Sequence, residues 1–238
     1  MSPIKEFLKT AMLPKVVKIS IRFGPALSSI TEQVDVMAYI KEREVDRVVY
    51  AANLTVDQIG RCLVFFSQVQ GRSRSDISAS LAAQLKSITN RQLADKEAKR
   101  HAREILQLMR VLEVVDEDLY LTLDGERLLR HYQNSRPKFL DYLAWLLLTR
   151  AGWLKVVYET DQLRRSVWYG LSMKDHAELL RDELKGSRLI RRTDSWQMGA
   201  LLDCLVYLRV LKPWNAIDMR FESDKERLYD VLLRKTFT

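Results

Sequence analysis

The chain has 238 residues, a formal net charge of +8, 47% hydrophobic residues and 29% charged residues. This balance provides enough apolar material for a core and enough charge for solubility, and the length favours two domains over one. The longest apolar run, residues 142–149, is far shorter than the roughly 20 residues of a membrane-spanning helix, so we expect no membrane partner. Residues 1–15 lack the long apolar region of a secretory signal.

The first 53 residues have the pattern of a small α/β extension. A short helix is expected over residues 3–12, followed by a strand over 15–23, where apolar and polar side chains alternate. A second helix is expected over residues 31–41 and a second strand over 47–51. No chemistry is evident in this segment, and we interpret residues 1–53 as a docking or dimerisation element.

Residues 54–134 predict three helices, a hairpin and a fourth helix. Thr55 and Gln58 form a capping-box pattern, and the apolar residues that follow recur at helical spacing: Ile59, Leu63, Phe66 and Val69. Further helices are expected from Asp76 over residues 76–87 and over residues 95–112. Strands at 113–115 and 119–123 would flank an acidic turn, and Thr122 or Asp124 would cap the last helix.

The stretch LQLMRVLEVVDEDLYLTLDGERLL, within residues 54–134, resembles the winged-helix transcription-regulator family. In that family the third helix ends in spaced leucines, and the last helix follows a leucine-threonine-x-x-glycine phrase, which here is Leu121, Thr122, Asp124 and Gly125. The resemblance implies a helix-turn-helix fold that binds DNA. One position departs from the pattern: Val111 stands where the family often has glycine.

A second copy of this unit is expected over residues 135–238. RVLEVVDEDLYLTLDGERL, from Arg110, and RVLKPWNAIDMRFESDKERL, from Arg209, share their first and last three letters. Helices are expected at 136–149, 174–187, 195–210 and 224–235, with a turn at 212–215, a strand at 217–221 and an insertion near 152–170. The predicted fold class is therefore mainly α with short β-hairpins (α+β): tandem winged-helix domains behind the small N-terminal α/β extension.

The third helix of the first unit has an apolar stripe and an opposite basic face. Ala98, Ala102, Ile105, Met109 and Leu112 follow helical spacing, and a series displaced by two residues lies about 200° away around the helix. We predict that this series and three flanking arginines contact DNA: Lys96, Lys99, Arg100, Arg103, Gln107, Arg110, Arg72, Arg74 and Arg91. The alternative is a solvated face whose cations pair with Glu97 and Glu104.

The second unit lacks this basic series. Its third helix is apolar around much of its circumference, which favours packing or oligomer formation through residues 135–238, with a second copy of the chain or another subunit. The acidic turn of the first unit, Asp116 to Asp118, is expected to point away from DNA, because like charges repel.

No catalytic or metal-binding pattern is evident, and no cofactor is predicted. His101, His131 and His176 are isolated, and Cys62 and Cys204 have the apolar neighbours of buried thiols in a reducing cytoplasm. Glu159 and Asp161 form only a weak nuclease pattern.

The sequence thus predicts a cytoplasmic, nucleoid-associated, non-enzymatic protein that binds duplex DNA in transcriptional regulation or DNA maintenance. The main alternative is a tandem winged-helix scaffold subunit that assembles proteins. A nuclease or helicase accessory domain is a weaker third hypothesis.

Overall fold

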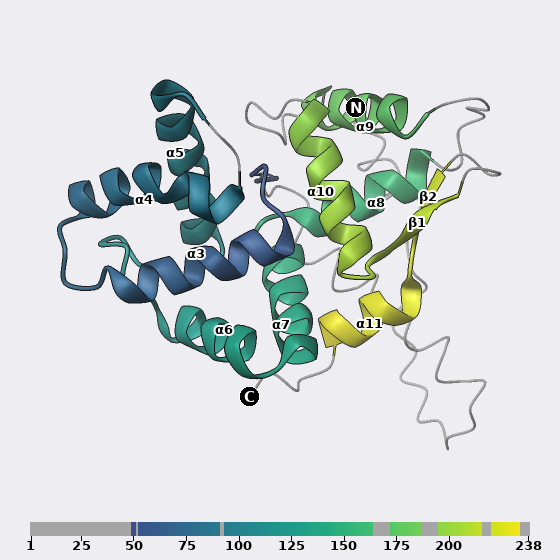
Figure 1. Ribbon diagram of the computed structural model, residues 1–238. Coiled ribbons are helices and arrows are strands. Elements are labelled where there is room, and N and C mark those ends of the chain that lie inside the picture. The colour runs from purple at the N-terminus through teal and green to yellow at the C-terminus, as the bar shows by residue number, and fades with distance from the viewer. Residues whose placement is uncertain are drawn as a thin grey trace, which may run out of the picture.

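The computed structural model describes residues 49–50, 52–90, 93–163, 172–186, 195–215 and 220–233. This part is mainly helical and contains a small two-stranded antiparallel sheet, which confirms the mainly α class (Figure 1). The elements expected in residues 1–48 lie outside the described residues.

Four helices form the first group of elements, and they begin where the capping residues place them. Thr55 and Gln58 make the expected capping box, with N–H to side-chain distances of 2.8 and 3.3 Å. Ser73 caps the second helix, which therefore begins at Arg74, two residues before the expected start. The helices are α3 (Val56–Gln68), α4 (Arg74–Thr89), α5 (Asp95–Val111) and α6 (Leu123–Asn134).

The second group also contains a helix that the sequence did not predict. This helix, α8, lies within the expected insertion, and Figure 1 shows α7 between the two groups. The elements are α7 (Arg136–Thr149), α8 (Trp153–Leu163), α9 (Met173–Gly186), α10 (Ser195–Tyr207), β1 (Leu211–Asn215), β2 (Arg220–Ser223) and α11 (Lys225–Leu233).

The two hairpins differ in length from the prediction. In the first group the expected strands reduce to one bridge, between Val115 and Leu121, because Asp116 caps a tight turn by accepting the N–H groups of Asp118 and Tyr120. Leu123, expected on a strand, instead begins α6 and is 83% exposed.

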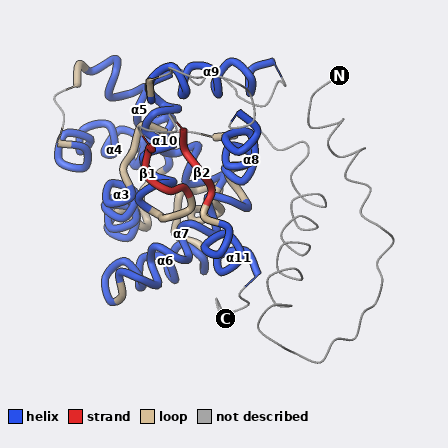
Figure 2. The backbone as a smooth tube through the Cα atoms, turned by 90° about the vertical axis from the view of Figure 1, so that its right-hand side faces the viewer, coloured by secondary structure: helices blue, strands red, loops and turns tan. Residues whose placement is uncertain are grey.

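In the second group, residues 212–215 were expected to form a turn and instead belong to β1. This strand pairs with β2 through Leu211–Ser223 and Lys212–Glu222, and the sheet lies in front of the helices in Figure 2. Pro213 fits there because a two-stranded sheet consists of edge strands, where a missing donor is tolerated.

The phrase Leu121, Thr122, Asp124, Gly125 fastens the turn to α6 and α7. Thr122 caps α6 and donates its hydroxyl to the carbonyl of Glu113 at 2.6 Å. Asp124 accepts hydrogen bonds from Tyr142 and Arg150. Burial alone would raise the pKa of Asp124, but these two donors hold it below its ordinary value.

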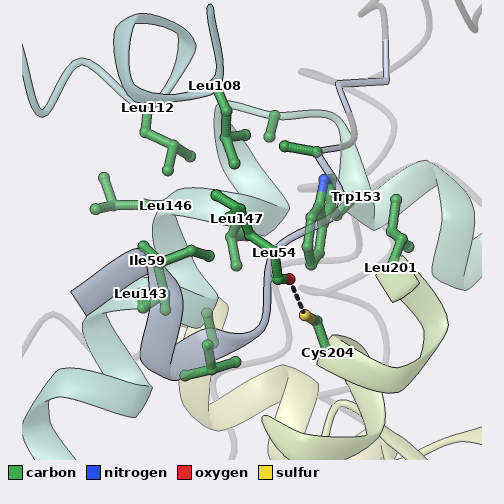
Figure 3. Packing of buried hydrophobic residues seen from close by; sticks show 14 of the residues in the cluster. Leu54, Ile59, Leu108, Leu112, Leu143, Leu146, Leu147, Trp153, Leu201 and Cys204 are labelled. Carbon is green, nitrogen blue, oxygen red and sulfur yellow. Dashed lines mark hydrogen bonds between the residues drawn. The ribbon is translucent and has the colours of Figure 1, made fainter. Parts of the chain in front are cut away.

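Buried side chains form one hydrophobic core that continues across both groups. In Figure 3, Leu54 and Trp153 lie between Leu147 of α7 and Leu201 of α10. The thiol of Cys204 donates to the carbonyl of Leu54 at 3.1 Å, and the Trp153 indole donates to the carbonyl of Tyr50 at 2.7 Å. The segment before α3 therefore covers one apolar side of α10 within the same chain.

The same hydrogen bonds occur at the start of α4 and at the start of α9. The hydroxyl of Ser73 donates to the carboxylate of Asp76 at 2.7 Å and accepts its N–H at 3.2 Å. Ser172 and Asp175 make the same two bonds at the same two distances. Counting from these caps, Arg74 corresponds to Met173, and Ser78 corresponds to Ala177.

The ends of α5 and α10 are matched in the same way. Glu113 and Arg209 both adopt left-handed conformations, with φ of 55° and 60°. The next residues are Val114 and Val210, and their N–H groups donate to the carbonyls of Met109 and Leu205, respectively. Their own carbonyls accept the N–H of the residue just before the last helix, Thr122 or Asp224.

These matched bonds give a different correspondence between the two segments from the one that the shared letters suggested. Glu113 is equivalent to Arg209, so Arg110 is equivalent to Val206 and not to the Arg209 that the shared letters Arg-Val-Leu had suggested. The Glu-Arg-Leu triplets also lie inside α6 and α11, at different distances from their caps. In this register Arg103 corresponds to Gly199, and Gln107 corresponds to Asp203.

Candidate nucleic-acid interface

Helix α5 separates its apolar and basic residues as the sequence predicts. Ala102, Ile105, Leu108 and Met109 are buried. The predicted contact residues on the other side of the helix are exposed: Lys96, Lys99, Arg100, Arg103 and Gln107. The core stripe and the basic face are therefore confirmed as structural features.

Few of these cations are neutralised by neighbouring carboxylates. Arg100 lies 3.8 Å from Glu104, which also lies 3.6 Å from His101. Within the described residues, Lys96, Lys99 and Arg103 have no ion-pair partner, and Glu97 pairs with none of them. A single exposed pair of this kind contributes roughly 0.3–0.5 kcal/mol, so it would not prevent Arg100 from binding a phosphate.

Arg110, the last residue of the predicted series, has a structural contact. Its guanidinium donates to the carbonyl of Glu117 at 2.6 Å and is half-buried. Its Nε is buried without a hydrogen-bond partner in the described part of the chain. Arg110 therefore holds the acidic turn against α5, and its side chain is less available to a ligand than that of Arg103.

A cleft between α4 and α5 brings four of the predicted residues together. It has a volume of about 410 Å³ and is lined by Arg74, Arg103, Gln107 and Arg110, together with Ser78 and Tyr50. Arg74 and Arg103 are exposed, and no described carboxylate pairs with either. The cleft offers guanidinium, amide and hydroxyl donors in one place, which is the donor set that phosphate oxygens accept.

The other predicted residues lie outside this cleft. Lys96, Lys99 and Arg100 occupy the first half of α5. Arg72 is exposed in the turn before α4, where its carbonyl accepts from the hydroxyl of Tyr120 at 3.3 Å. Arg91 falls outside the described residues. Sequence reasoning missed Tyr50 and Ser78, because the tertiary fold brings Tyr50 to this place and Ser78 has no distinctive local pattern.

The acidic turn limits the basic surface on one side. Asp116, Glu117 and Asp118 are all exposed. They lie close to the C-terminal end of α5, where Arg110 contacts the turn. The accessible cations of α5 belong to its first three turns, away from this turn. A polyanion would therefore approach the beginning of α5 and the cleft beside α4.

A second cleft occupies the matched position between α9 and α10. It has a volume of about 790 Å³, and its lining includes Met173, Ala177, Gly199 and Asp203. In the register given by the matched hydrogen bonds, these residues replace Arg74, Ser78, Arg103 and Gln107. The second cleft thus has the position of the first without its arginines.

Asp161, one of the two residues of the weak nuclease pattern, has structural partners. Asp161 accepts from Ser223 and from Lys225, the latter at 2.6 Å, and so joins α8 to the end of β2. Burial raises the pKa of both Cys62 and Cys204 to about 12. The described residues contain no cluster of His, Cys, Asp and Glu suited to a metal ion, and none of their helices has the length and apolar character needed to cross a membrane.

Comparisons with known proteins give no relative: no family model, no curated protein and no solved structure matches this chain.

Proposed function

We propose that the protein binds duplex DNA through the outer face of α5 and the α4–α5 cleft, as one unit of a tandem winged-helix chain. The observation that carries this proposal is the exposed row of cations opposite the buried stripe of α5. Lys96, Lys99 and Arg103 are free of ion pairs among the described residues, so their charge is available to phosphates.

The element order supports the winged-helix interpretation of both halves. The first runs through α3, α4, α5, a bridged turn and α6. The second runs through α7, α9, α10, the β1–β2 hairpin and α11, with α8 inserted. In this fold the third helix enters the major groove, which is about 12 Å wide. Lys96 and Gln107 lie about 17 Å apart along α5, at 1.5 Å per residue, so the row between them is longer than the groove is wide.

Each part of the surface would have its own role. Arg100 and Arg103 are suited to base edges or phosphates on either side of the groove, and the lysines to phosphates alone. Arg74, across the cleft, would hold the DNA backbone against α4. We propose transcriptional regulation or DNA maintenance as the process that this DNA binding serves.

The test is the salt dependence of duplex binding, measured by fluorescence anisotropy on the full chain. Each phosphate contact contributes a slope of about −0.9 to log K against log salt. Arg100→Glu/Arg103→Glu should weaken binding at least tenfold and make the slope less negative by about 2.

The matched control is Arg130→Glu/Lys138→Glu, which makes the same change of net charge at exposed positions of α6 and at the start of α7. Helix α6 lies on the other side of α3 from α5 in Figure 1, so the control changes surface charge away from the proposed site. Binding by the control should equal that of the wild type. Unchanged binding by the α5 variant would overturn the assigned surface.

A second candidate function is a scaffold subunit that binds proteins. The exposed acidic turn and the lack of arginine and lysine in α10 favour it. A scaffold would show no duplex affinity beyond the nonspecific range, about 10⁻⁴ to 10⁻⁶ M. The same anisotropy titration therefore separates the two functions.

A further inference from the structure

The α9–α10 cleft has the size and lining of a small-molecule site. Its volume of about 790 Å³ falls within the range of about 300–1,000 Å³ that ligand pockets occupy. Its walls come from α9, α10 and residues 53–57, the segment that leads into α3. Leu54, Val56, Leu202 and Phe221 supply apolar surface. The cleft therefore provides a wall from each group of helices.

The changes at the matched positions remove two arginines and add a carboxylate, and the cation that lines the second cleft, Lys174, lies beside Glu178. Met173 stands in place of Arg74, and Gly199 in place of Arg103, so two guanidinium groups are lost. Asp203 stands in place of Gln107, so a neutral amide becomes a carboxylate. A phosphate, which suits the first cleft, would be repelled in the second.

Among the described residues that line this cleft, Asp203 is the carboxylate without an ion-pair partner. Asp57 lies 2.6 Å from Arg136, and Glu178 lies 4.0 Å from Lys174. Among the described residues no cation pairs with Asp203, whose side chain is exposed. Partial burial raises the pKa of its carboxyl, because the neighbouring wall of the cleft is apolar. A cation beside Asp203 would relieve this unfavourable environment.

We propose that the α9–α10 cleft binds a small apolar molecule that carries one ammonium group, with the ammonium beside Asp203 and the apolar body against Leu54, Val56 and Leu202. The half-exposed ring of Tyr207 forms part of the rim; its hydroxyl accepts a hydrogen bond from Arg136 at 2.7 Å, which fixes the ring. A small molecule fits better than a protein partner because the cleft is bounded by the chain segment before α3. This inference is independent of DNA binding.

The test compares two probes of equal length and opposite charge, octylammonium and octanoate, by isothermal titration calorimetry on the full chain. Octylammonium should bind at least tenfold more tightly than octanoate. Asp203→Asn should abolish this preference, because it keeps the shape of the side chain and removes its charge. Asp118→Asn, which removes one exposed charge from the acidic turn, is the matched control and should leave the preference unchanged.

A second variant locates the binding without depending on charge. A Cβ atom at Gly199 would meet nothing within 4 Å, so Gly199→Leu extends into the cleft without a collision at its base. This variant should fold normally, as judged by its thermal unfolding, and should lose octylammonium binding. Equal binding of the two probes, no binding of octylammonium, a preference for octylammonium that survives Asp203→Asn, or octylammonium binding that survives Gly199→Leu would each overturn the proposal.

Discussion

The two clefts of this molecule occupy matched positions and have opposite chemistry. Each lies between a helix capped by a serine–aspartate pair and a helix that is followed by a residue in the left-handed conformation, Glu113 or Arg209. The first is lined by Arg74, Arg103 and Arg110, and the second by Met173, Gly199 and Asp203. The backbone bonds determine where a cleft forms, and the few side chains on its walls determine what it can bind.

The largest expected effect concerns the glycine that only the first half requires. A Cβ atom at Gly125 would lie 2.0 Å from the carbonyl oxygen of Val114, so the backbone would have to move. Gly125→Ala should lower the free energy of unfolding by about 3 kcal/mol, as overpacking does. Arg227, the third residue after the cap of α11, has a side chain at the matched position. Urea denaturation provides the measurement, and an unchanged free energy of unfolding for Gly125→Ala would contradict this close approach.

The next effect concerns a histidine at a core position. His176 of α9 corresponds to Ile77 of α4, and burial lowers its pKa to about 4. Below pH 6.5 the imidazole of His176 binds a proton in the unfolded chain but stays neutral in the folded chain, so acid favours unfolding. Between pH 7 and pH 5 this amounts to about 2 kcal/mol, from about 1.36 kcal/mol per pKa unit.

His176→Ile should remove this part of the acid sensitivity. The measurement is the urea midpoint of the wild type and the variant at pH 7 and pH 5. A variant that loses as much stability as the wild type over this range would show that another group is responsible.

A smaller effect separates two arginines of the first cleft. Arg103→Met should weaken duplex binding about fivefold to tenfold, as expected for one charged contact, without changing stability. Arg110→Met should instead lower stability by about 1 kcal/mol, because the carbonyl of Glu117 loses its donor. Anisotropy and urea denaturation of both variants test this division of roles. If both variants lost DNA affinity equally and kept their stability, Arg110 would also belong to the DNA-contact surface.

The smallest effects have opposite signs at two glycines. Gly199 lies within α10, with open space at its Cβ position, so Gly199→Ala should stabilise the protein by about 0.5–1 kcal/mol. Gly71 has a φ of +83°, so Gly71→Ala should destabilise it by about 1 kcal/mol. Thermal unfolding of both variants provides the measurement, and shifts of the same sign would be inconsistent with these backbone conformations.

Local signals were sufficient for most helices. Thr55, Gln58 and Thr122 act within three residues of the groups they cap, so their positions in the sequence locate the beginnings of α3 and α6. The separation of basic and apolar faces on α5 follows from helical spacing alone. These features depend on neighbouring residues, and the structure confirms them.

Features that depend on distant residues were not predicted. The length of the first hairpin depends on how tightly Asp116 closes its turn, and Leu123 looked like a strand residue because it alternates with Leu119 and Leu121. The matching letters Arg-Val-Leu suggested a register that differs from the one given by the conformations and hydrogen bonds at Glu113 and Arg209. The cleft beside α5 requires Tyr50, whose place is set by its bonds to Ala151 and Trp153.

Backbone amide chemical shifts of the full chain, recorded by NMR during titration with a short DNA duplex, test the contrast between the clefts most directly. We expect shifts at Arg74, Ser78 and residues 96–107, with no change at Met173, Ala177, Gly199 and Asp203. Shifts centred on the second set, or no shifts in the first, would contradict it.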